Sequence, residues 1–256
     1  MAINIIVVGA AGKMGREIIK IIREKKHALT AAIDQFNDPS ADPTGLLIEN
    51  NLERRIKDSD VTVEFTSAAA TMEHIKINEK HGKPAVIGTT GLSTEQVSQI
   101  RSAASAISVV FSPNMSIGVN LLFKLTELAA KIIRDDFDAE VLEAHHHFKK
   151  DAPSGTAMKL VEILAKELGR DMKKDIVYGR EGLVGERKKR EIGVMSIRAG
   201  DIVGEHTVLL AGQGERIELI HRATDRSSLA RGAVLAAEWV VKQKPGLYSM
   251  YDVLGL

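Results

Sequence analysis

The sequence predicts an α/β protein in two domains, the first built on a parallel sheet and the second, an α+β domain, on an open mixed sheet. Strand-like and helix-like stretches alternate through the first 116 residues, which is typical of βαβ units. Between residues 192 and 223, three strand-like stretches follow one another without intervening helices, as in an open, mixed or antiparallel sheet. We therefore expect domains at residues 1–116 and 117–226, with a C-terminal helix and tail at residues 227–256.

Each strand expected in the first domain is a short apolar run rich in β-branched residues. These runs are residues 3–8, 29–33, 61–65, 85–87 and 107–111. Apolar residues at helical spacing predict helices at residues 14–22, 68–80 and 94–104, the last one after a cap at Ser93 or Thr94. The polar stretch at residues 35–57 contains Pro39 and Pro43 and predicts an irregular connection.

The second domain is expected to begin with an amphipathic helix at residues 120–133 and a strand at residues 139–148. A loop with Pro153 leads to a helix that ends at Leu168. The remaining elements are expected as strands at residues 192–199, 207–211 and 216–223, a helix at residues 228–241 and an irregular tail. The basic run at residues 187–190 is interpreted as a solvated loop rather than as a site for polyanions.

The composition excludes several classes of protein. Lys plus Arg number 35 and Asp plus Glu 34, and this net charge of +1 argues against a nucleic-acid-binding protein. The chain has no cysteine, which excludes disulfides, cysteine nucleophiles and cysteine-ligated metal sites. No segment approaches the roughly 18 continuous apolar residues of a membrane span, and the N-terminal residues do not resemble a signal peptide. We expect a cytoplasmic protein without nucleic-acid or membrane partners.

A glycine-rich turn follows the first expected strand and opens the first helix. Its spacing is G-x-x-G-x-x-G, in which glycine allows a tight turn and lets the backbone approach a pyrophosphate at the helix N-terminus. Asp34 ends the second strand, where a carboxylate can accept hydrogen bonds from ribose hydroxyls. The pattern predicts a Rossmann-type dinucleotide-binding domain; the alternative is a structural turn with Asp34 as an ordinary strand-end residue. The candidate nucleotide contacts here are Gly9, Ala10, Ala11, Gly12, Lys13, Met14 and Asp34.

The residues around Asp34 also bear on the choice of nucleotide. A carboxylate at this position favours a free 2′-hydroxyl and repels a 2′-phosphate, and Gln35 adds no positive charge. We therefore expect NADH as the preferred cofactor, with NADPH as the alternative. Two further turns follow expected strands at the edge where nucleotides bind, although each is also consistent with a plain structural turn. Their residues are Gly88, Thr89 and Thr90, and Ser112, Pro113, Asn114 and Met115.

The densest group of reactive side chains lies between residues 143 and 157. Three consecutive histidines and Lys149 precede a Pro-Ser-Gly-Thr segment that starts a helix. The amides and hydroxyls of Ser154, Gly155 and Thr156 suit a carboxylate or phosphate, to which His146 and Lys149 add positive charge. A histidine is also a natural general acid near neutral pH. The pattern predicts a small dianionic substrate that is protonated during the reaction.

Two other interpretations of the histidines stay open. His145 and His147 would face the same side of a strand and could bind a metal, but no second cluster completes the coordination, so we expect no metal site. Alternatively, the histidines are surface residues on an edge strand and Ser154 is only a helix cap. His147 is expected to be structural or solvent-facing rather than catalytic.

These motifs resemble those of the 4-hydroxy-tetrahydrodipicolinate reductase (dihydrodipicolinate reductase) family. Residues 143–157 match the family signature E-x-H-H-x-x-K-x-D-A-P-S-G-T-A throughout. The glycine turn, Gly-Thr-Thr-Gly at residues 88–91, Asn-Met-Ser-x-Gly at residues 114–118 and the segment at residues 198–206 also match. The resemblance covers essentially the whole chain.

The resemblance implies reduction of a cyclic imine dicarboxylate to tetrahydrodipicolinate with loss of water, in the diaminopimelate route to lysine. It identifies His145 as the proton donor and Lys149 as a residue that assists protonation and binds a carboxylate. It further implies that the C-terminal helix returns to the dinucleotide domain and that the open sheet assembles a homotetramer. The substrate-binding positions that it implies are His146, Ser154, Gly155 and Thr156, with Arg226 as a further candidate for a carboxylate contact.

Two rival functions remain. Another two-domain NAD(P)-dependent dehydrogenase, acting on amino or sugar acids, would share the nucleotide half but would leave the His-His-x-x-Lys pattern unexplained. A non-catalytic nucleotide-sensing protein would tolerate the loss of His145 and Lys149, and this chain has both.

Overall fold

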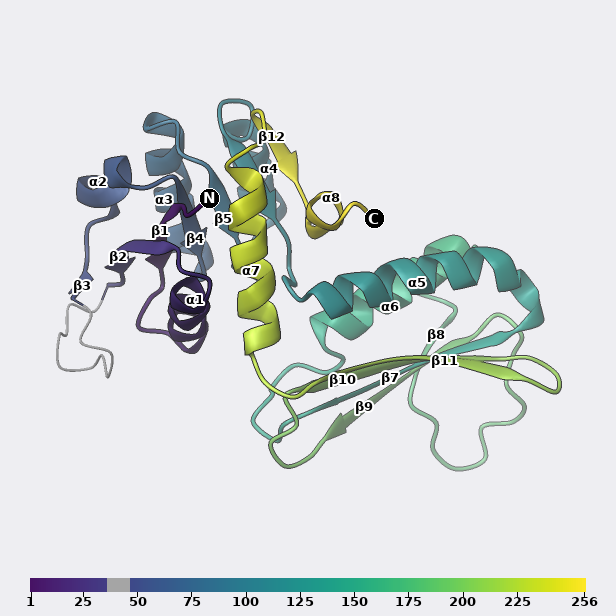
Figure 1. Ribbon diagram of the computed structural model, residues 1–256. Helices are drawn as coiled ribbons and strands as arrows, with labels where there is room; N and C mark the ends of the chain where they lie inside the picture. The colour runs from purple at the N-terminus through teal and green to yellow at the C-terminus, as the bar shows by residue number, and fades with distance from the viewer. Residues whose placement is uncertain (36–46) are drawn as a thin grey trace. The chain divides into compact units, whose positions relative to one another are not determined.

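The computed structural model describes residues 1–35 and 47–256, which form two compact units (Figure 1). The first unit consists of Met1–Ile117 and Arg226–Leu256, and the second of Gly118–Asp225. Pro39 and Pro43, in the expected irregular connection, lie outside the described residues. Within the described part of the chain, no helix is long and apolar enough to span a membrane.

A parallel sheet forms the centre of the first unit, with seven strands among the described residues, in the order β12-β6-β5-β4-β1-β2-β3. The order changes direction between β1 and β4, and in such sheets ligands bind at the carboxyl ends of the strands beside this point. The predicted Rossmann-type fold is confirmed. The strands are β1 (Asn4–Val8), β2 (Ala28–Ile33), β3 (Ile48–Glu49), β4 (Val61–Glu64), β5 (Ala85–Ile87), β6 (Ser108–Phe111) and β12 (Gly246–Tyr248).

Helices cover both faces of this sheet. The helices α1 (Lys13–Glu24), α7 (Ser227–Val240) and α8 (Met250–Leu254) pack on the face to which Ile5 and Val7 point. The helices α2 (Leu52–Arg55), α3 (Ala68–Lys80) and α4 (Thr94–Ala103) pack on the other face. Because both faces are buried, the strands are continuously apolar, which is the pattern that predicted them. The predicted cap of α4 is confirmed at Ser93, which forms a capping box with Gln96.

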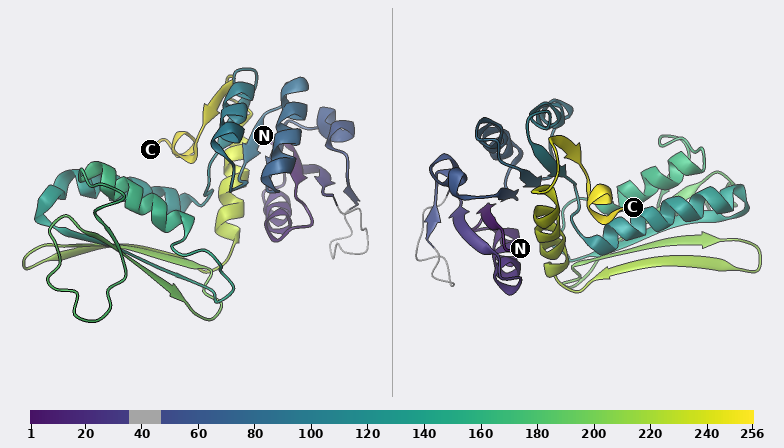
Figure 2. Two further views of the ribbon diagram at one scale, coloured as in Figure 1. Left: turned by 180° about the vertical axis from the view of Figure 1, so that it is seen from behind. Right: turned by 45° about the horizontal axis from the view of Figure 1, so that its top comes forward.

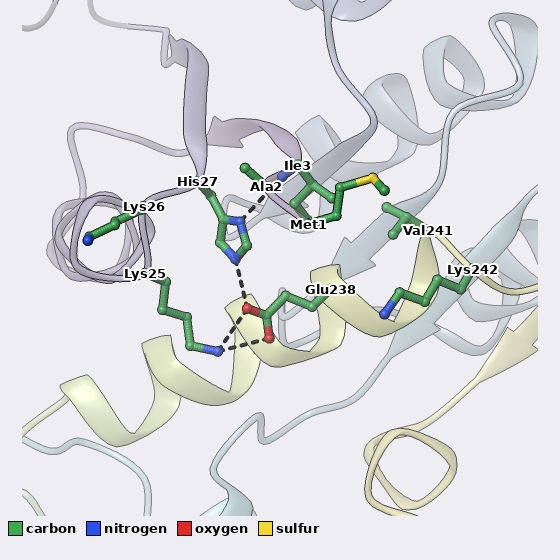
Figure 3. Close-up of a pocket in the computed structure, with 9 residues that line it drawn as sticks. All are labelled: Met1, Ala2, Ile3, Lys25, Lys26, His27, Glu238, Val241 and Lys242. Atoms are coloured by element: carbon green, nitrogen blue, oxygen red, sulfur yellow. Dashed lines mark hydrogen bonds and ion pairs between the residues drawn. The ribbon is translucent and has the colours of Figure 1, made fainter.

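A charged cluster joins α7 to the end of α1 (Figure 3). Glu238 of α7 forms an ion pair with Lys25 at 2.8 Å, and its Oε1 lies 2.7 Å from Nε2 of His27. Lys25, Lys26 and Lys242 lie at the C-terminal ends of α1 and α7, where positive charge complements the helix dipole. These contacts attach the C-terminal helix to the N-terminal part of the sheet.

Two sequence predictions for the first unit are wrong. Part of the expected irregular connection forms β3, α2 and a 3-10 turn (Ile56–Asp58), with Asn51 capping α2 through the amide of Arg54. The expected irregular tail forms β12, which pairs with β6, and α8, whose Met250 is buried in the core. These elements are too short to show a periodic pattern, and they are stabilised by packing on the sheet rather than by local propensity.

The second unit contains a five-stranded mixed sheet in the order β11-β10-β7-β9-β8, which confirms the predicted open mixed sheet. The first three strands are antiparallel to one another in that order, whereas β9 is parallel to β7 and β8. Helices α5 (Ile117–Ile133) and α6 (Gly155–Glu167) lie over one face of the sheet (Figure 2). The strands are β7 (Asp138–His145), β8 (Ile176–Tyr178), β9 (Ile192–Arg198), β10 (Gly204–Ala211) and β11 (Arg216–Ala223).

Three details of the second unit differ from the predictions. The strand expected at residues 139–148 ends at His145, and β8 was not expected. Arg187 is not a solvated loop residue: it is half-buried and contacts Asp138 at 2.6 Å and Glu140 at 2.9 Å. Arg180 also pairs with Glu140, at 3.0 Å. Part of the basic run is therefore neutralised by acidic residues at the start of β7.

Candidate active site

The glycine turn lies between the carboxyl end of β1 and the start of α1. Gly9 has a φ of +85°, and a Cβ at this position would lie 2.2 Å from the carbonyl oxygen of Phe65. A Cβ on Gly15 would lie 2.2 Å from the carbonyl oxygen of Gly9. A side chain at either position would separate the turn from its neighbours. The two glycines therefore let the N-terminus of α1 lie directly beside the strand ends, which is the geometry that suits a pyrophosphate.

The other residues predicted at this turn differ in exposure. Ala10 is buried in the core and Met14 packs against it, so neither side chain faces solvent fully. Gly12 and Lys13 are exposed at the start of α1. The main chain and the exposed Lys13 side chain are thus presented to a ligand at this end of the helix, next to the half-buried Ala11 and the exposed Arg16.

Asp34 lies beside the glycine turn, at the carboxyl end of β2. Its Oδ2 accepts a hydrogen bond from the amide of Ala11 at 3.0 Å. The amides of Gly9 and Ala10 donate to the carbonyl oxygen of Ile33 at 2.8 and 3.0 Å. These bonds hold the turn against β2. A pocket of about 370 Å³ opens here, and its lining includes Gly9, Gly12, Asp34, Gln35, Phe65, Glu73 and His74.

The turn after β5 lies against the end of β4. A Cβ on Gly88 would lie 2.2 Å from the Phe65 ring, so only glycine allows this ring to pack there. Thr89 is buried, and its hydroxyl accepts a hydrogen bond from Thr71 at 2.8 Å. Thr90 is exposed. The structure therefore places the predicted residues 88–90 at the same sheet edge as the glycine turn, with Phe65 contacting both.

The turn after β6 is held by its own side chains. The Ser112 hydroxyl donates to the carbonyl oxygen of Asn114 at 2.9 Å, and the Asn114 side chain accepts from the amide of Ser116 at 2.9 Å. Pro113 is exposed, whereas the Met115 side chain is buried in the core of the first unit. Met115 can therefore contact a ligand only through its main chain.

A second group of predicted residues lies in the second unit, at the carboxyl end of β7. Side chains alternate along this strand, so Val141, Glu143 and His145 share the buried face. Oε2 of Glu143 lies 2.5 Å from Nδ1 of His145. An ionised carboxylate can only accept hydrogen bonds, so Nδ1 carries a proton and donates it. This leaves Nε2 of His145 as the nitrogen that can accept or release a proton.

Arg198, at the end of the parallel strand β9, fixes the charge of Glu143. Its guanidinium donates to both carboxylate oxygens, at 2.8 and 2.9 Å, and the amide of Ser154 donates to Oε1 at 3.3 Å. Burial opposes ionisation of Glu143, but hydrogen bonds from Arg198, Ser196 and His145 outweigh it and lower the pKa of Glu143 to about 2. Glu143 is therefore a fixed negative charge behind His145.

His206, on β10, lies edge-on to His145 with ring centroids 5.2 Å apart. Its Nε2 is 3.1 Å from the hydroxyl of Ser154. Burial, reinforced by the charge of His145, lowers the pKa of His206 to about 4, so this ring is neutral near pH 7. Burial also lowers the pKa of His145, although Glu143 opposes that effect. The two imidazoles thus stay close together without mutual charge repulsion.

The start of α6 borders these histidines. Ser154 is the helix cap, and its hydroxyl accepts from the amide of Ala157 at 3.1 Å. Gly155 is exposed, and a Cβ there would meet nothing within 4 Å; Thr156 is half-buried. Open space therefore lies in front of a helix N-terminus, where main-chain amides and the dipole favour an anion.

The loop after β7 supplies the remaining predicted side chains. Lys149 is half-buried and pairs with Asp151 at 2.9 Å. His146 is half-buried, and its Nδ1 is buried without a hydrogen-bond partner among the described residues. His147 is exposed, its ring 3.8 Å from that of Phe148, which agrees with the predicted solvent-facing position. Because β7 ends at His145, His147 does not share a strand face with it.

The structure brings three further residues to this site for which the sequence predicts no role. Glu143 could have been found, because a residue two positions before His145 on a strand shares its face. Arg198 and His206 are the ends of the segment at residues 198–206 that matches the family, but their contacts with Glu143 and His145 depend on how β9 and β10 pair with β7. The spacing of these residues along the chain gives no signal of that pairing.

Arg226 is the remaining candidate for a contact with the substrate, and metal binding is the remaining alternative for the histidines. Arg226 directly precedes α7 in the first unit, and its carbonyl oxygen accepts from the amides of Leu229 and Ala230. Its contact with a substrate carboxylate stays a prediction. Within residues 1–35 and 47–256, no group of three or more metal-ligating side chains is present.

Comparison with known proteins identifies the family. Two family models match nearly the whole chain: "Dihydrodipicolinate reductase, N-terminus" at residues 3–115 and "Dihydrodipicolinate reductase, C-terminus" at residues 118–254. The chain belongs to the dihydrodipicolinate reductase family. It is 47% identical to the 4-hydroxy-tetrahydrodipicolinate reductase of Syntrophus aciditrophicus, over 98% of this chain and 97% of that one. The corresponding protein of Syntrophobacter fumaroxidans is 46% identical over 98% of each chain. The chain is thus an NAD(P)H-dependent oxidoreductase, as predicted.

Solved structures agree with this assignment. A dipicolinate-bound dihydrodipicolinate reductase from Paenisporosarcina sp. TG-14 matches with a TM-score of 0.79 and 26% identity, over 98% of this chain and 99% of that one. GenD2 from gentamicin A biosynthesis, in complex with NAD, matches with a TM-score of 0.63 and 15% identity, over 99% of this chain and 90% of that one. The second match shows the fold alone.

Proposed function

We propose that this protein reduces 4-hydroxy-tetrahydrodipicolinate to tetrahydrodipicolinate with loss of water, in the diaminopimelate route to lysine. The observation that carries the proposal is the His145–Glu143 pair, which lies beside Lys149 and the start of α6 in a chain of this reductase family. The His145–Glu143 pair provides an oriented proton donor. Lys149 and the start of α6 provide sites for an anion. The proposal includes a cytoplasmic location.

The first unit is assigned to the nucleotide, which supplies a hydride when bound. Glycine fits the cradle, because a Cβ on Gly9, Gly15 or Gly88 would lie 2.2 Å from neighbouring atoms. The residues proposed to contact the nucleotide are Gly9, Ala10, Ala11, Gly12, Lys13, Met14, Asp34, Gly88, Thr89, Thr90, Ser112, Pro113, Asn114 and Met115.

NADH is the proposed preferred nucleotide, with NADPH as the alternative. The pocket beside the glycine turn is lined by two carboxylates, Asp34 and Glu73, and none of its described lining residues is lysine or arginine. A 2′-phosphate would therefore meet two carboxylates in this pocket, with His74 as the cationic group among the described lining residues, whereas ribose hydroxyls would find acceptors.

The second unit is assigned to the cyclic dicarboxylate. His145 is the proposed proton donor, and Glu143 holds its Nδ1 so that Nε2 is left to transfer the proton. Lys149 is proposed to bind a carboxylate and to favour protonation by neutralising charge. His146, Ser154, Gly155 and Thr156 are the proposed carboxylate sites, with Arg226 as a further contact.

A homotetramer is the proposed assembly. The helices α5 and α6 cover one face of the second sheet, and apolar residues such as Leu142, Met195, Ile197 and Ile220 lie on the other face. Ile197 and Ile220 are about half exposed, at 50% and 43%. Burial of such a face between copies would remove apolar surface from water.

A coupled assay tests the function. The substrate is made in situ from pyruvate and aspartate semialdehyde by the preceding synthase, and oxidation of NADH and NADPH is followed in parallel. We expect rapid oxidation that depends on the protein, a kcat lowered at least ~100-fold in His145→Gln, and a nucleotide Kd that is unchanged. His147→Gln is the matched control and should keep wild-type kcat. Folded, nucleotide-binding protein that oxidises neither nucleotide would refute the proposed function.

A further inference from the structure

The hydrogen bonds around His145 determine which of its nitrogens can change protonation. Glu143 is held as an anion by two hydrogen bonds from Arg198, and it lies 2.5 Å from Nδ1. Nδ1 therefore keeps its proton in both charge states of the ring. No described residue hydrogen-bonds Nε2, which lies 3.1 Å from the position of a Cβ on Gly204. Any proton that the ring gains or loses must be on Nε2.

The groups that face His145 come from several elements. Glu143 lies on β7, Arg198 on β9 and the neutral His206 on β10, while Ser154 caps α6. The loop after β7 adds the Lys149–Asp151 ion pair, and β11 places His221 opposite His206. Burial lowers the pKa of His145; Glu143 opposes this, and the positive charges of Lys149 and Arg198 lower it further. Without a bound anion beside it, the ring is therefore mostly neutral near pH 7.

A bound dicarboxylate would reverse this balance. Its two negative charges would lie near Lys149 and the start of α6, where Asp151, the partner of Lys149, is exposed. An opposite charge within about 4–6 Å raises the pKa of a histidine by about 1–3. That change is large enough to convert a mostly neutral ring into a mostly protonated one near pH 7.

We propose that binding of the dicarboxylate draws one proton from solvent onto Nε2 of His145, and that Glu143, held by Arg198, is the positioning residue that directs the proton there. The inference rests on the proposed function, because it requires a dicarboxylate at this site. The proton balance is simple. Solvent loses one proton, Nε2 gains it, and the Nδ1 proton stays in the hydrogen bond to Glu143. The same proton is then the one that the reduction consumes together with the hydride.

His145 therefore becomes a proton donor only when the substrate is bound. The free protein carries a neutral ring that cannot donate from Nε2, and the complex carries an imidazolium whose two donors point at Glu143 and at the ligand. His206 cannot compete for the proton, because its burial holds its pKa at about 4. Substrate binding should therefore tighten as the pH falls from about 8 to 6.5, by up to tenfold for each pH unit.

Proton uptake is measured directly by calorimetry. Dipicolinate, which cannot be reduced at the same centre, is titrated into NADH-saturated protein at pH 7.5 in phosphate, HEPES and Tris buffers. The slope of the observed enthalpy against the ionisation enthalpy of the buffer gives the number of protons taken up. We expect roughly 0.5–1 proton per site in the wild-type protein and none in His145→Gln. His147→Gln, which changes an exposed histidine of the same run, is the matched control and should keep the wild-type number.

The role of Glu143 is tested by the pair Glu143→Gln and Glu143→Asp. The amide lacks the charge that favours imidazolium and no longer dictates which nitrogen carries the proton, so Glu143→Gln should take up fewer than about 0.3 protons. Glu143→Asp keeps the charge and should recover most of the uptake. Glu140→Gln removes a carboxylate of the same strand that pairs with two arginines but points away from His145, and it should behave as the wild type.

Several results would overturn the inference. The inference is refuted if the wild-type protein takes up almost no proton. It is also refuted if His145→Gln takes up as many protons as the wild type, or if folded Glu143→Gln does. Absence of dipicolinate binding would also overturn it, because the required anion would not bind beside His145. The coupled assay distinguishes failure of this inference from failure of the proposed function. Normal reduction with no proton uptake refutes the inference alone. Absence of reduction refutes the proposed function.

Discussion

Replacement of Gly15 by alanine should weaken nucleotide binding by displacing α1 from the end of β1. The added Cβ would lie 2.2 Å from the carbonyl oxygen of Gly9 and 2.6 Å from the Cα of Ala10, both main-chain atoms that cannot rotate away. Contacts of this kind do not fall below 3.0 Å, so the helix start must move by about 1 Å. The main-chain amides at the start of α1 would move with it.

The expected losses of stability and of NADH affinity follow from this displacement. Overpacking of a buried contact costs about 1–3 kcal/mol of stability. A shift of about 1 Å in a group that binds the nucleotide should cost about 1.4–2.8 kcal/mol of binding free energy, which is about a 10–100-fold higher Kd for NADH. The affinity is measured by calorimetric titration of NADH, and stability by thermal unfolding of the free protein.

A control on the same helix separates affinity from stability. Ile22 is fully buried at the other end of α1, and Ile22→Val should cost about 0.5–1.5 kcal/mol of stability without moving the turn. Its NADH Kd should equal that of the wild type. A Gly15→Ala protein that binds NADH within twofold of the wild type would refute the argument that the glycine is needed for the close approach.

Three further changes test other parts of the structure. Asp34→Asn removes the charge that repels a 2′-phosphate, so the ratio of kcat/KM for NADH to that for NADPH should fall about tenfold; an unchanged ratio would show that Asp34 does not set the preference. Ser154→Ala removes the cap of α6 and the hydroxyl partner of buried His206, and should lower the free energy of unfolding by about 1–3 kcal/mol in urea titrations, whereas a loss below about 0.5 kcal/mol would contradict that role. The pKa of Glu143 falls to about 2 in the folded protein, below its value near 4.5 in the unfolded chain, so its stabilising contribution is complete above about pH 5 and is lost as the pH falls toward 2. The stability difference between wild type and Glu143→Gln should therefore be about 2 kcal/mol larger at pH 7 than at pH 3, and a difference independent of pH would contradict it.

Local patterns were sufficient for most of the first unit. Buried parallel strands are continuously apolar, and amphipathic helices show a 3.6-residue period, so β1, β4, β5, α3 and α4 were found within one or two residues. The patterns failed for β3, α2, β8, β12 and α8, which have two to five residues each. Elements this short carry no period of their own, and pairing with a neighbouring strand or packing on the sheet decides whether they form.

The candidate site also combines residues that local sequence patterns reveal with residues that only the tertiary structure brings together. Its signature residues lie within 15 positions of one another, so His145, Lys149 and the start of α6 were recognisable as one group. Arg198 joins them from 55 residues beyond Glu143, through the parallel register that sets His145 opposite Arg198. The proton donor was therefore recognisable from the sequence, whereas the groups that set its charge were not.

The sequence by itself determined the fold class, the glycine turn and the residues that can donate protons, because these depend on periodicity and on residue type at short spacing. Only the tertiary structure decided that Glu143 is a permanent anion, that His206 is neutral and that Nε2 of His145 is the nitrogen free to exchange a proton. The physical reason is that burial and hydrogen-bond partners set protonation, and strand pairing brings those partners from distant parts of the chain.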